Sequence, residues 1–235
     1  MWQIALLIIV IIVVFLYFGL GVVVKFYLRW RFLAVMASSE RICLTFDDGP
    51  DDKITPQILE LLSEYGAKAT FFVVGEKVEQ HPQLARRIVE MGHEIGEHGY
   101  RHLHPWKSSP LNSSAEVVKA RRIIDKLGVT KKPILYRPPY GKLNFLLLIS
   151  LWDQRRQVVF WNIDPKDYQQ QSGQKVAQFV IDRLAPGSVI LLHDGRTGNG
   201  SQGSVTVTAL QSILEEIKRR ELHLATVREL LEKSA

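Results

Sequence analysis

The strongest constraint on the fold is a regular alternation of strand-like and helix-like segments that begins near residue 41 and continues to the C-terminus. The strand-like segments are short, apolar and bounded by Gly, Pro or polar residues, and the segments between them have apolar residues at helical spacing. This alternation is typical of a parallel sheet with helical crossovers, so we predict one barrel-like α/β domain. The predicted strands cover residues 42–46, 69–74, 94–96, 134–137, 158–163, 188–192 and 222–226.

The N-terminal segment has a different character. Residues 1–24 contain no charged side chain, and residues 4–24 would span roughly 30 Å as a helix, which is the thickness of the hydrocarbon core of a bilayer. A cleaved signal peptide would combine a basic N-terminal region with a shorter apolar core, and this segment has neither. We therefore expect residues 1–24 to be a single transmembrane anchor, residues 25–40 a basic juxtamembrane connector, and residues 41–235 the soluble domain.

The distribution of charge bears on the orientation of this anchor and on possible partners. The chain carries 30 basic and 24 acidic residues, a formal net charge of +6. Lys25, Arg29 and Arg31 precede the first acidic residue, and without them 27 basic and 24 acidic residues give a net charge of +3. So small an excess, with no basic stripe interleaved with aromatic residues, argues against nucleic-acid binding. Basic residues after a membrane helix favour the cytoplasmic side for the segment that follows.

Polar side chains collect where the predicted strands end. Asp47 and Asp48 follow the first strand and precede a Gly-Pro turn, and two adjacent carboxylates repel unless a cation or a proton lies between them. His98 and His102 follow the third strand at a spacing that places both imidazoles on one face of a helical turn. Two histidines and one carboxylate leave open coordination positions, as in a catalytic zinc site. Taken alone, each segment is also compatible with a solvated turn or with unrelated loop histidines.

Two further strand ends carry groups suited to acyl transfer. Pro138 and Pro139 lack an N–H, so Tyr140 offers the first backbone donor after Arg137. The two prolines stiffen this turn, which suits the donor of an oxyanion hole but is also compatible with a simple rigid loop. His193 follows the apolar sixth strand and is placed for proton transfer near neutral pH. The single cysteine, Cys43, excludes an intrachain disulfide. The remaining histidines are expected to be structural or surface residues: His81, His93, His104 and His223.

Five segments, in this order, resemble the motifs of the polysaccharide deacetylase family, the NodB-homology domain of carbohydrate esterase family 4. The likeness covers about residues 41–231 and implies a distorted (β/α) barrel of about seven parallel strands. Gly99 stands where the second motif usually has Ser or Thr, and Tyr168 stands where the fourth has Trp. The matching segments are 45–50 (TFDDGP), 98–102 (HGYRH), 137–141 (RPPYG), 164–168 (DPKDY) and 191–193 (LLH).

The resemblance implies a metal centre. By position in the motifs, Asp48, His98 and His102 would hold one divalent ion, and Asp47 would be the catalytic base. Zinc is the expected ion, with Co²⁺, Ni²⁺ or Mn²⁺ as alternatives.

The resemblance also implies roles for residues around that centre. Arg137 would orient the base, the Tyr140 N–H would stabilise the oxyanion, and His193 would be the general acid. Asp167 would tune an arginine or histidine partner. The expected substrate-binding residues are Tyr140 and Leu191 together with two aromatic residues of the fifth loop, Trp161 and Tyr168.

The expected reaction is metal-assisted hydrolysis of an N-acetyl or other N-acyl group on an amino sugar. The first interpretation is an extracytoplasmic enzyme acting on peptidoglycan or another polysaccharide. The second is a deacetylase or deformylase of an amino sugar carried on a polyprenyl phosphate at the membrane surface, which the anchor and the basic connector favour. A catalytically silent carbohydrate-binding protein is opposed by the presence of every metal and proton-transfer position. A metal-dependent phosphatase is opposed by the third and fifth motifs, which fit acyl transfer better.

Overall fold

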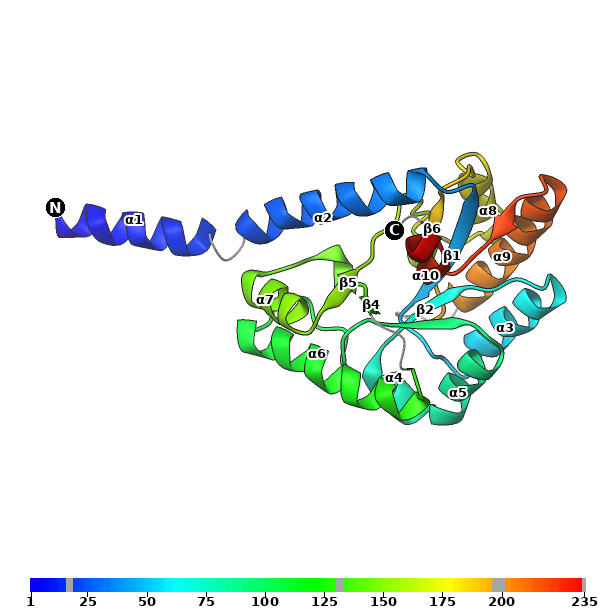
Figure 1. Cartoon of the computed structure of the whole chain (residues 1–235), viewed down its shortest axis with the longest axis horizontal. Helices are drawn as coiled ribbons and strands as arrows, with labels where there is room; N and C mark the ends of the chain where they lie inside the picture. Colours follow the sequence, from blue (N-terminus) through cyan, green and yellow to red (C-terminus); the bar gives the residue numbers. More distant parts are fainter. Residues whose placement is uncertain (16–18, 130–132, 196–201, 234–235) are drawn as a thin grey trace.

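The computed structural model describes residues 1–15, 19–129, 133–195 and 202–233, and parallel strands form its centre (Figure 1). The sheet has seven strands in the order β5-β4-β3-β2-β1-β6, and β7 pairs with β1. All pairings are parallel, as the alternating sequence pattern predicted. The strands are β1 (Arg41–Asp47), β2 (Thr70–Val73), β3 (Glu94–Glu97), β4 (Ile134–Tyr136), β5 (Arg156–Val158), β6 (Val189–His193) and β7 (His223–Leu224).

The two edges of the sheet meet through the residues that follow β5. The fifth strand was predicted over residues 158–163, but the ladder with β4 ends at Val158. The chain then crosses to β6, where Ile163 bridges Ile190 in parallel and its carbonyl accepts a hydrogen bond from Leu191 N at 2.9 Å. This crossing closes the sheet into a distorted barrel, because β5 and β6 are its outermost strands.

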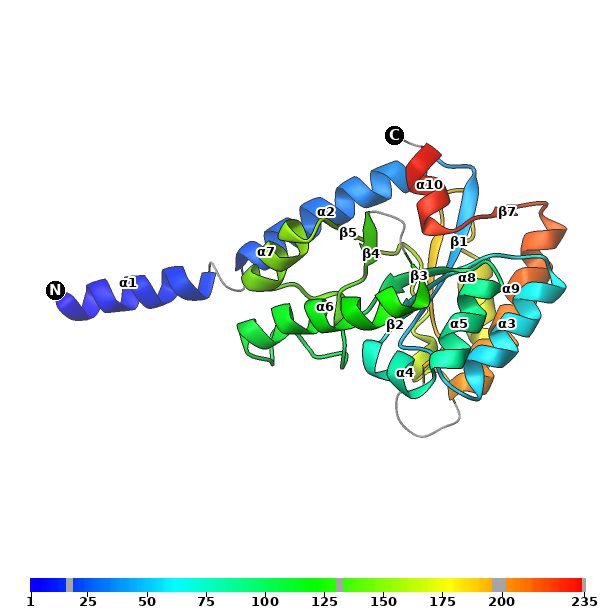
Figure 2. The same cartoon turned by 60° about the horizontal axis from the view of Figure 1, so that its bottom comes forward.

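Helices cover the outside of the barrel, with α3, α5 and α9 on one side and α6 and α7 on another (Figures 1 and 2). Their buried faces are apolar, as the 3.6-residue spacing predicted. The start of α7 shows the local cause of one boundary, because the Asn144 side chain accepts a hydrogen bond from Leu147 N at 2.9 Å. The helices are α3 (Ile54–Glu64), α4 (Gly75–Gln80), α5 (Pro82–Glu90), α6 (Pro110–Ile124), α7 (Phe145–Asp153), α8 (Gly173–Ile181), α9 (Gln202–Arg219) and α10 (Val227–Lys233).

The predicted transmembrane anchor is wrong, and so is the single-pass membrane location that rested on it. Within the described ranges, no helix combines the length and the apolar character that a bilayer crossing requires. Helix α1 (Trp2–Val14) has 13 residues, about 20 Å of helix. Helix α2 (Leu20–Ala37) contains three basic residues. Residues 16–18, inside the predicted span, lie outside the described residues.

Helix α2 lies over the barrel and occupies most of the range predicted as a connector. Its Phe32 and Met36 side chains are buried, and the Phe32 ring meets the Phe160 ring edge to face at a centroid distance of 6.4 Å. The close approach of Gly187 to the Met36 carbonyl places the end of α2 beside the start of β6. Helix α2 therefore runs along the region where the edges of the sheet meet. Helix α1 projects away from the barrel and has no buried residue (Figures 1 and 2).

Candidate metal and proton-transfer site

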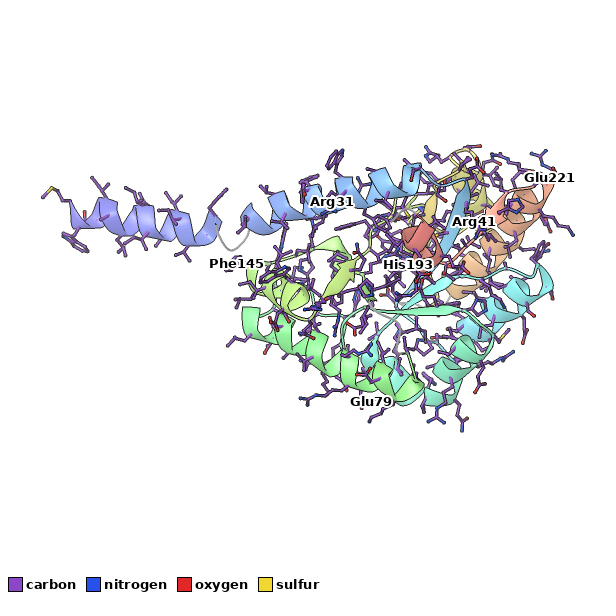
Figure 3. All side chains as sticks on the ribbon, in the orientation of Figure 1. Arg31, Arg41, Glu79, Phe145, His193 and Glu221 are labelled. Carbon is purple, nitrogen blue, oxygen red and sulfur yellow. The ribbon has the colours of Figure 1, made fainter. Side chains whose placement is uncertain are left out.

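The predicted site residues other than the buried Arg137 and Asp167 line one cleft at the carboxyl ends of the strands. In the ladder between β1 and β6, Asp47 is in register with His193, so these two side chains start from neighbouring positions. Figure 3 labels His193 among the strands, inside the ring of outer helices. The cleft has a volume of about 460 Å³ and is lined by Asp47, Asp48, His98, His102, His104, Pro138, Tyr140, Gly141, Lys142, Trp161, Asp164, Tyr168, Leu191 and His193.

Asp48, His98 and His102 form a cluster that fits a metal ion. Asp48 Oδ1 lies 3.4 Å from His98 Nε2 and 3.2 Å from His102 Nε2, and one ligand atom from each residue lies within 4.8 Å of the others. Asp48 Oδ1 is buried, and no described donor has hydrogen-bond geometry toward it. A buried carboxylate oxygen without a donor, facing two imidazole nitrogens, is the arrangement that a cation would satisfy.

The surroundings of the cluster orient His98 and favour the ligand forms of His102 and Asp48. His98 Nδ1 is 2.7 Å from the Arg137 carbonyl oxygen, to which it donates, and this leaves Nε2 as the free lone pair. Burial is the largest cause that lowers the pKa of His102 to about 4, so this imidazole is neutral at pH 7. Burial acts to raise the pKa of Asp48, but the neighbouring imidazoles hold it below its ordinary value.

Arg137 fixes the second carboxylate of the pair. Its Nη1 donates to Asp47 Oδ1 at 2.7 Å and to Thr45 Oγ1 at 2.8 Å, and its Nη2 donates to the Phe160 carbonyl at 3.2 Å. The guanidinium carbon lies 4.1 Å from the centre of the Phe72 ring. Arg137 is fully buried, so it holds Asp47 in one orientation, with the other carboxylate oxygen 3.7 Å from His98 Nε2.

Asp167 holds His193 in a similar way on the other side of the cleft. Asp167 Oδ1 lies 2.7 Å from His193 Nδ1, and Oδ2 accepts hydrogen bonds from the His193 backbone N–H at 2.8 Å and from Thr206 Oγ1 at 2.7 Å. Burial acts to lower the pKa of His193, but the Asp167 carboxylate outweighs it and raises this pKa to about 9. His193 is therefore protonated at pH 7, with Nε2 as the remaining donor.

The four predicted substrate-binding residues all line this cleft. Tyr140 has a φ of 56° and an exposed side chain, and its ring lies 4.6 Å from that of His102. The Tyr168 ring meets the His193 ring edge to face at 4.9 Å, so a tyrosine fills the motif position of the usual tryptophan. Leu191 and Trp161 lie on β6 and on the crossing segment after β5.

Several residues of the site were not predicted. His104, expected to be structural or on the surface, lines the cleft with its ring 4.7 Å from that of Tyr140. Lys142 also lines the cleft, one residue beyond the third motif. Thr206 reaches Asp167 from α9, and Lys77 Nζ donates to the Asp48 carbonyl at 2.6 Å from α4. The proximity of His104 to the second motif and of Lys142 to the third is visible in the sequence, whereas the contacts of Thr206 and Lys77 depend on the fold.

A closed parallel α/β barrel with this cluster at the carboxyl ends of its strands is an arrangement suited to metal-assisted hydrolysis. Residues 35–151 match the polysaccharide deacetylase family. A peptidoglycan-N-acetylglucosamine deacetylase from Bacillus cereus is 36% identical over 207 residues, which are 87% of this chain and 93% of the relative. A peptidoglycan-N-acetylmuramic acid deacetylase from Bacillus subtilis is 33% identical over 190 residues, 76% of this chain and 39% of the relative.

Solved structures agree with the sequence relatives. The crystal structure of a peptidoglycan N-acetylglucosamine deacetylase superposes with a TM-score of 0.75 at 32% identity and covers 82% of this chain and 88% of that chain. The chain belongs to the polysaccharide deacetylase family. The predicted family and the predicted enzyme class, a carbohydrate N-deacetylase, are therefore confirmed.

Proposed function

We propose that this chain removes the N-acetyl group from an amino sugar in peptidoglycan or a related polysaccharide, using a metal ion held by Asp48, His98 and His102. One observation carries the proposal: the metal-fitting cluster lies between an arginine-held carboxylate and an aspartate-held histidine in a single cleft. Relatives that act on N-acetylglucosamine or N-acetylmuramic acid of peptidoglycan support this substrate class.

The metal supplies Lewis acidity when bound, because a divalent cation polarises an amide carbonyl and lowers the pKa of a water molecule toward 7. Zinc fits a donor set of two imidazole nitrogens and one carboxylate oxygen, and we propose it as the ion.

Asp47 is proposed as the general base. Its Oδ1 is engaged by Arg137, and its Oδ2 faces the metal cluster, where it can take the proton of the attacking water. The neighbouring Asp48 is committed to the metal, so the two adjacent carboxylates have different tasks. Charge pairing with Arg137 keeps Asp47 oriented while the proton is transferred.

His193 is proposed as the general acid, and Tyr140 as the oxyanion donor. His193 carries its proton at neutral pH because Asp167 stabilises the charged imidazole, and it can donate from Nε2 to the departing amine. The Tyr140 backbone N–H would stabilise the negative charge that develops on the acyl oxygen, an effect worth about 3 kcal/mol for one such donor. Leu191 and Trp161 would form apolar walls around the acetyl group and the sugar ring.

The central test replaces the base. Asp47→Asn should lower acetate release from N-acetylated glycans by about 10²- to 10⁴-fold, the range for loss of a general base. The variant should still bind one metal ion per chain, because Asp48 and the two histidines are unchanged. Full activity in this variant would contradict the mechanism. Assays on peptidoglycan fragments, chitooligosaccharides and prenyl-linked amino sugars in parallel would identify the substrate class.

Metal removal provides a second test. Dialysis against a chelator should abolish acetate release, and addition of one equivalent of Zn²⁺ should restore it. His98→Ala and His102→Ala should each lose metal in direct metal analysis, whereas His93→Ala, which changes a buried histidine outside the cleft, should keep it. Metal retention in both ligand variants would rule out the assigned cluster.

A further inference from the structure

One face of α2 carries two basic residues that lie near residues of the cleft. Gly21, Lys25 and Arg29 are spaced four residues apart, so they lie along one face of the helix. We call Lys25, Arg29 and the nearby Lys142 the cationic rim. All three side chains are half-buried.

Contacts at both ends of this face fix its position. A side-chain carbon on Gly21 would lie 2.6 Å from the Leu143 carbonyl, so this turn of α2 packs directly on the backbone next to Lys142. Two turns later, Arg29 Nη2 donates a hydrogen bond at 3.2 Å to the carbonyl of Trp161, which lines the cleft. Lys25 lies between these two contacts, and the charge of Lys142 acts on it, so Lys25 lies near the part of the cleft that Lys142 lines.

The positive charges of the cationic rim lie apart from the acidic groups of the part of the chain that the structure describes. Among the described residues, no carboxylate oxygen lies within 4.0 Å of a nitrogen of Lys25, Arg29 or Lys142. Burial and the charges of Lys142 and Arg29 lower the pKa of Lys25, which agrees with the close approach of the three groups. Lys142 Nζ lies 4.5 Å from the centre of the Trp106 ring.

Asp164, the third acidic residue that lines the cleft, interacts with residues other than those of the cationic rim. Asp164 Oδ1 accepts a hydrogen bond from Lys166 N at 3.0 Å, and its charge acts on Arg137 and Tyr168. Three like charges held together at half burial repel one another, and an anion that binds among them would relieve the repulsion.

We propose that the cationic rim is a subsite for an oxyanion carried by the amino-sugar substrate, either a carboxylate or a phosphate. The inference rests on the proposed function, because the anion is a substituent of the sugar that enters the same cleft. The lactyl carboxylate of N-acetylmuramic acid and the phosphate of a sugar phosphate both present a negatively charged oxygen group. Unsubstituted N-acetylglucosamine units carry no such group. The cationic rim thus selects among N-acetylated sugars that the metal cluster would treat alike.

The test compares kcat/KM for acetate release from three substrates with wild-type enzyme and variants. The neutral substrate is a chitooligosaccharide, the carboxylate substrate is a peptidoglycan glycan strand freed of stem peptides, and the phosphate substrate is N-acetylglucosamine 1-phosphate. Lys25→Gln and Lys142→Gln should each lower the ratio of anionic to neutral kcat/KM by about threefold or more, through KM, as expected for loss of one partly exposed ion pair. The double variant should lower it further, and added salt should reduce the wild-type ratio.

Arg31→Gln is the matched control, because Arg31 is a basic residue of the same helix outside the cationic rim (Figure 3). It removes the same charge and should leave the ratio unchanged. If the ratio of anionic to neutral kcat/KM is the same in the wild type and the double variant, the subsite proposal is wrong. Acetate release from any of the substrates would still support the proposed deacetylation. Wild-type enzyme that releases acetate from none of the substrates would instead overturn the proposed function. A larger effect on the carboxylate or on the phosphate substrate identifies the source of the oxyanion.

Discussion

His193 shows how a single side chain acquires its properties from residues far away in the sequence. Asp167 binds both its ring nitrogen and its backbone N–H, and Thr206 anchors the same carboxylate from α9. A free histidine has a pKa near 6.5 and would be mostly neutral at pH 8. The raised pKa of about 9 keeps His193 protonated as the proposed acid over this range.

Asp167→Asn should separate this effect from simple positioning. Removal of the negative charge lowers the pKa of His193, so the alkaline limb of kcat against pH should move to lower pH by one unit or more, at about 1.4 kcal/mol per unit. At pH 6 the variant should keep more of the wild-type rate than at pH 8.5. Thr206→Val is the milder control, because it removes one hydrogen bond to Asp167 without changing its charge. An unshifted alkaline limb in Asp167→Asn would contradict this account.

At the residue scale, the sequence predicted site residues best where the chemistry uses residues that are close together in the sequence. The Asp47–Asp48 pair and the spacing of His98 and His102 indicated a cation, and the structure brings the three expected ligands together. Thr206 and Lys25 could not be predicted. The hydrogen bond of Thr206 to Asp167 spans 39 residues, and the place of Lys25 depends on how α2 docks on the barrel.

At the element scale, strands were more predictable than the N-terminal helices. The first strand was predicted within one residue at each end, because its apolar run is bounded by charged residues. The observed fifth strand begins and ends earlier than predicted, because most of the predicted apolar run is buried in the crossing from β5 to β6 and not in the ladder with β4. Residues of α2 were assigned partly to a membrane anchor and partly to a connector, yet Phe32 of this helix packs against Phe160 of the barrel.

Phe32→Ala tests the packing of α2 on the barrel. Phe32 is 3% exposed, so truncation should lower the free energy of unfolding by about 3 kcal/mol through lost apolar burial and a cavity. Trp30→Ala on the same helix is the control, because its side chain is 66% exposed and its loss should cost less than about 0.5 kcal/mol. Urea unfolding measures both. Equal destabilisation by the two substitutions would show that α2 does not dock as described.

At the scale of the whole molecule, the chain divides between α1 and α2. No residue of α1 is buried, whereas α2 contributes Phe32 and Met36 to the core. Burial favours a boundary before α2, and the boundary of the soluble domain at residue 41 stays a prediction. The match to the family begins at residue 35 and likewise leaves out most of α2.

Two truncations test this division. Deletion of residues 2–19 should change the melting temperature by less than about 2 °C, because it removes no buried side chain among the described residues. Deletion of residues 2–40 removes α2 and should lower the melting temperature by about 10 °C or more, or prevent folding, since it exposes apolar surface over the edges of the sheet. Thermal unfolding followed by circular dichroism distinguishes the two outcomes. Equal melting temperatures would place the boundary after α2.

The in-register pairing of Asp47 and His193 has a consequence for how such an enzyme can diversify. The proposed base and acid stand on the paired strands β1 and β6, where a change of register would turn one of them to the other face of the sheet. The cationic rim belongs to a separate helix and to a loop, whose side chains can change without disturbing that ladder. The bond that is cleaved and the sugar that is accepted can therefore evolve independently.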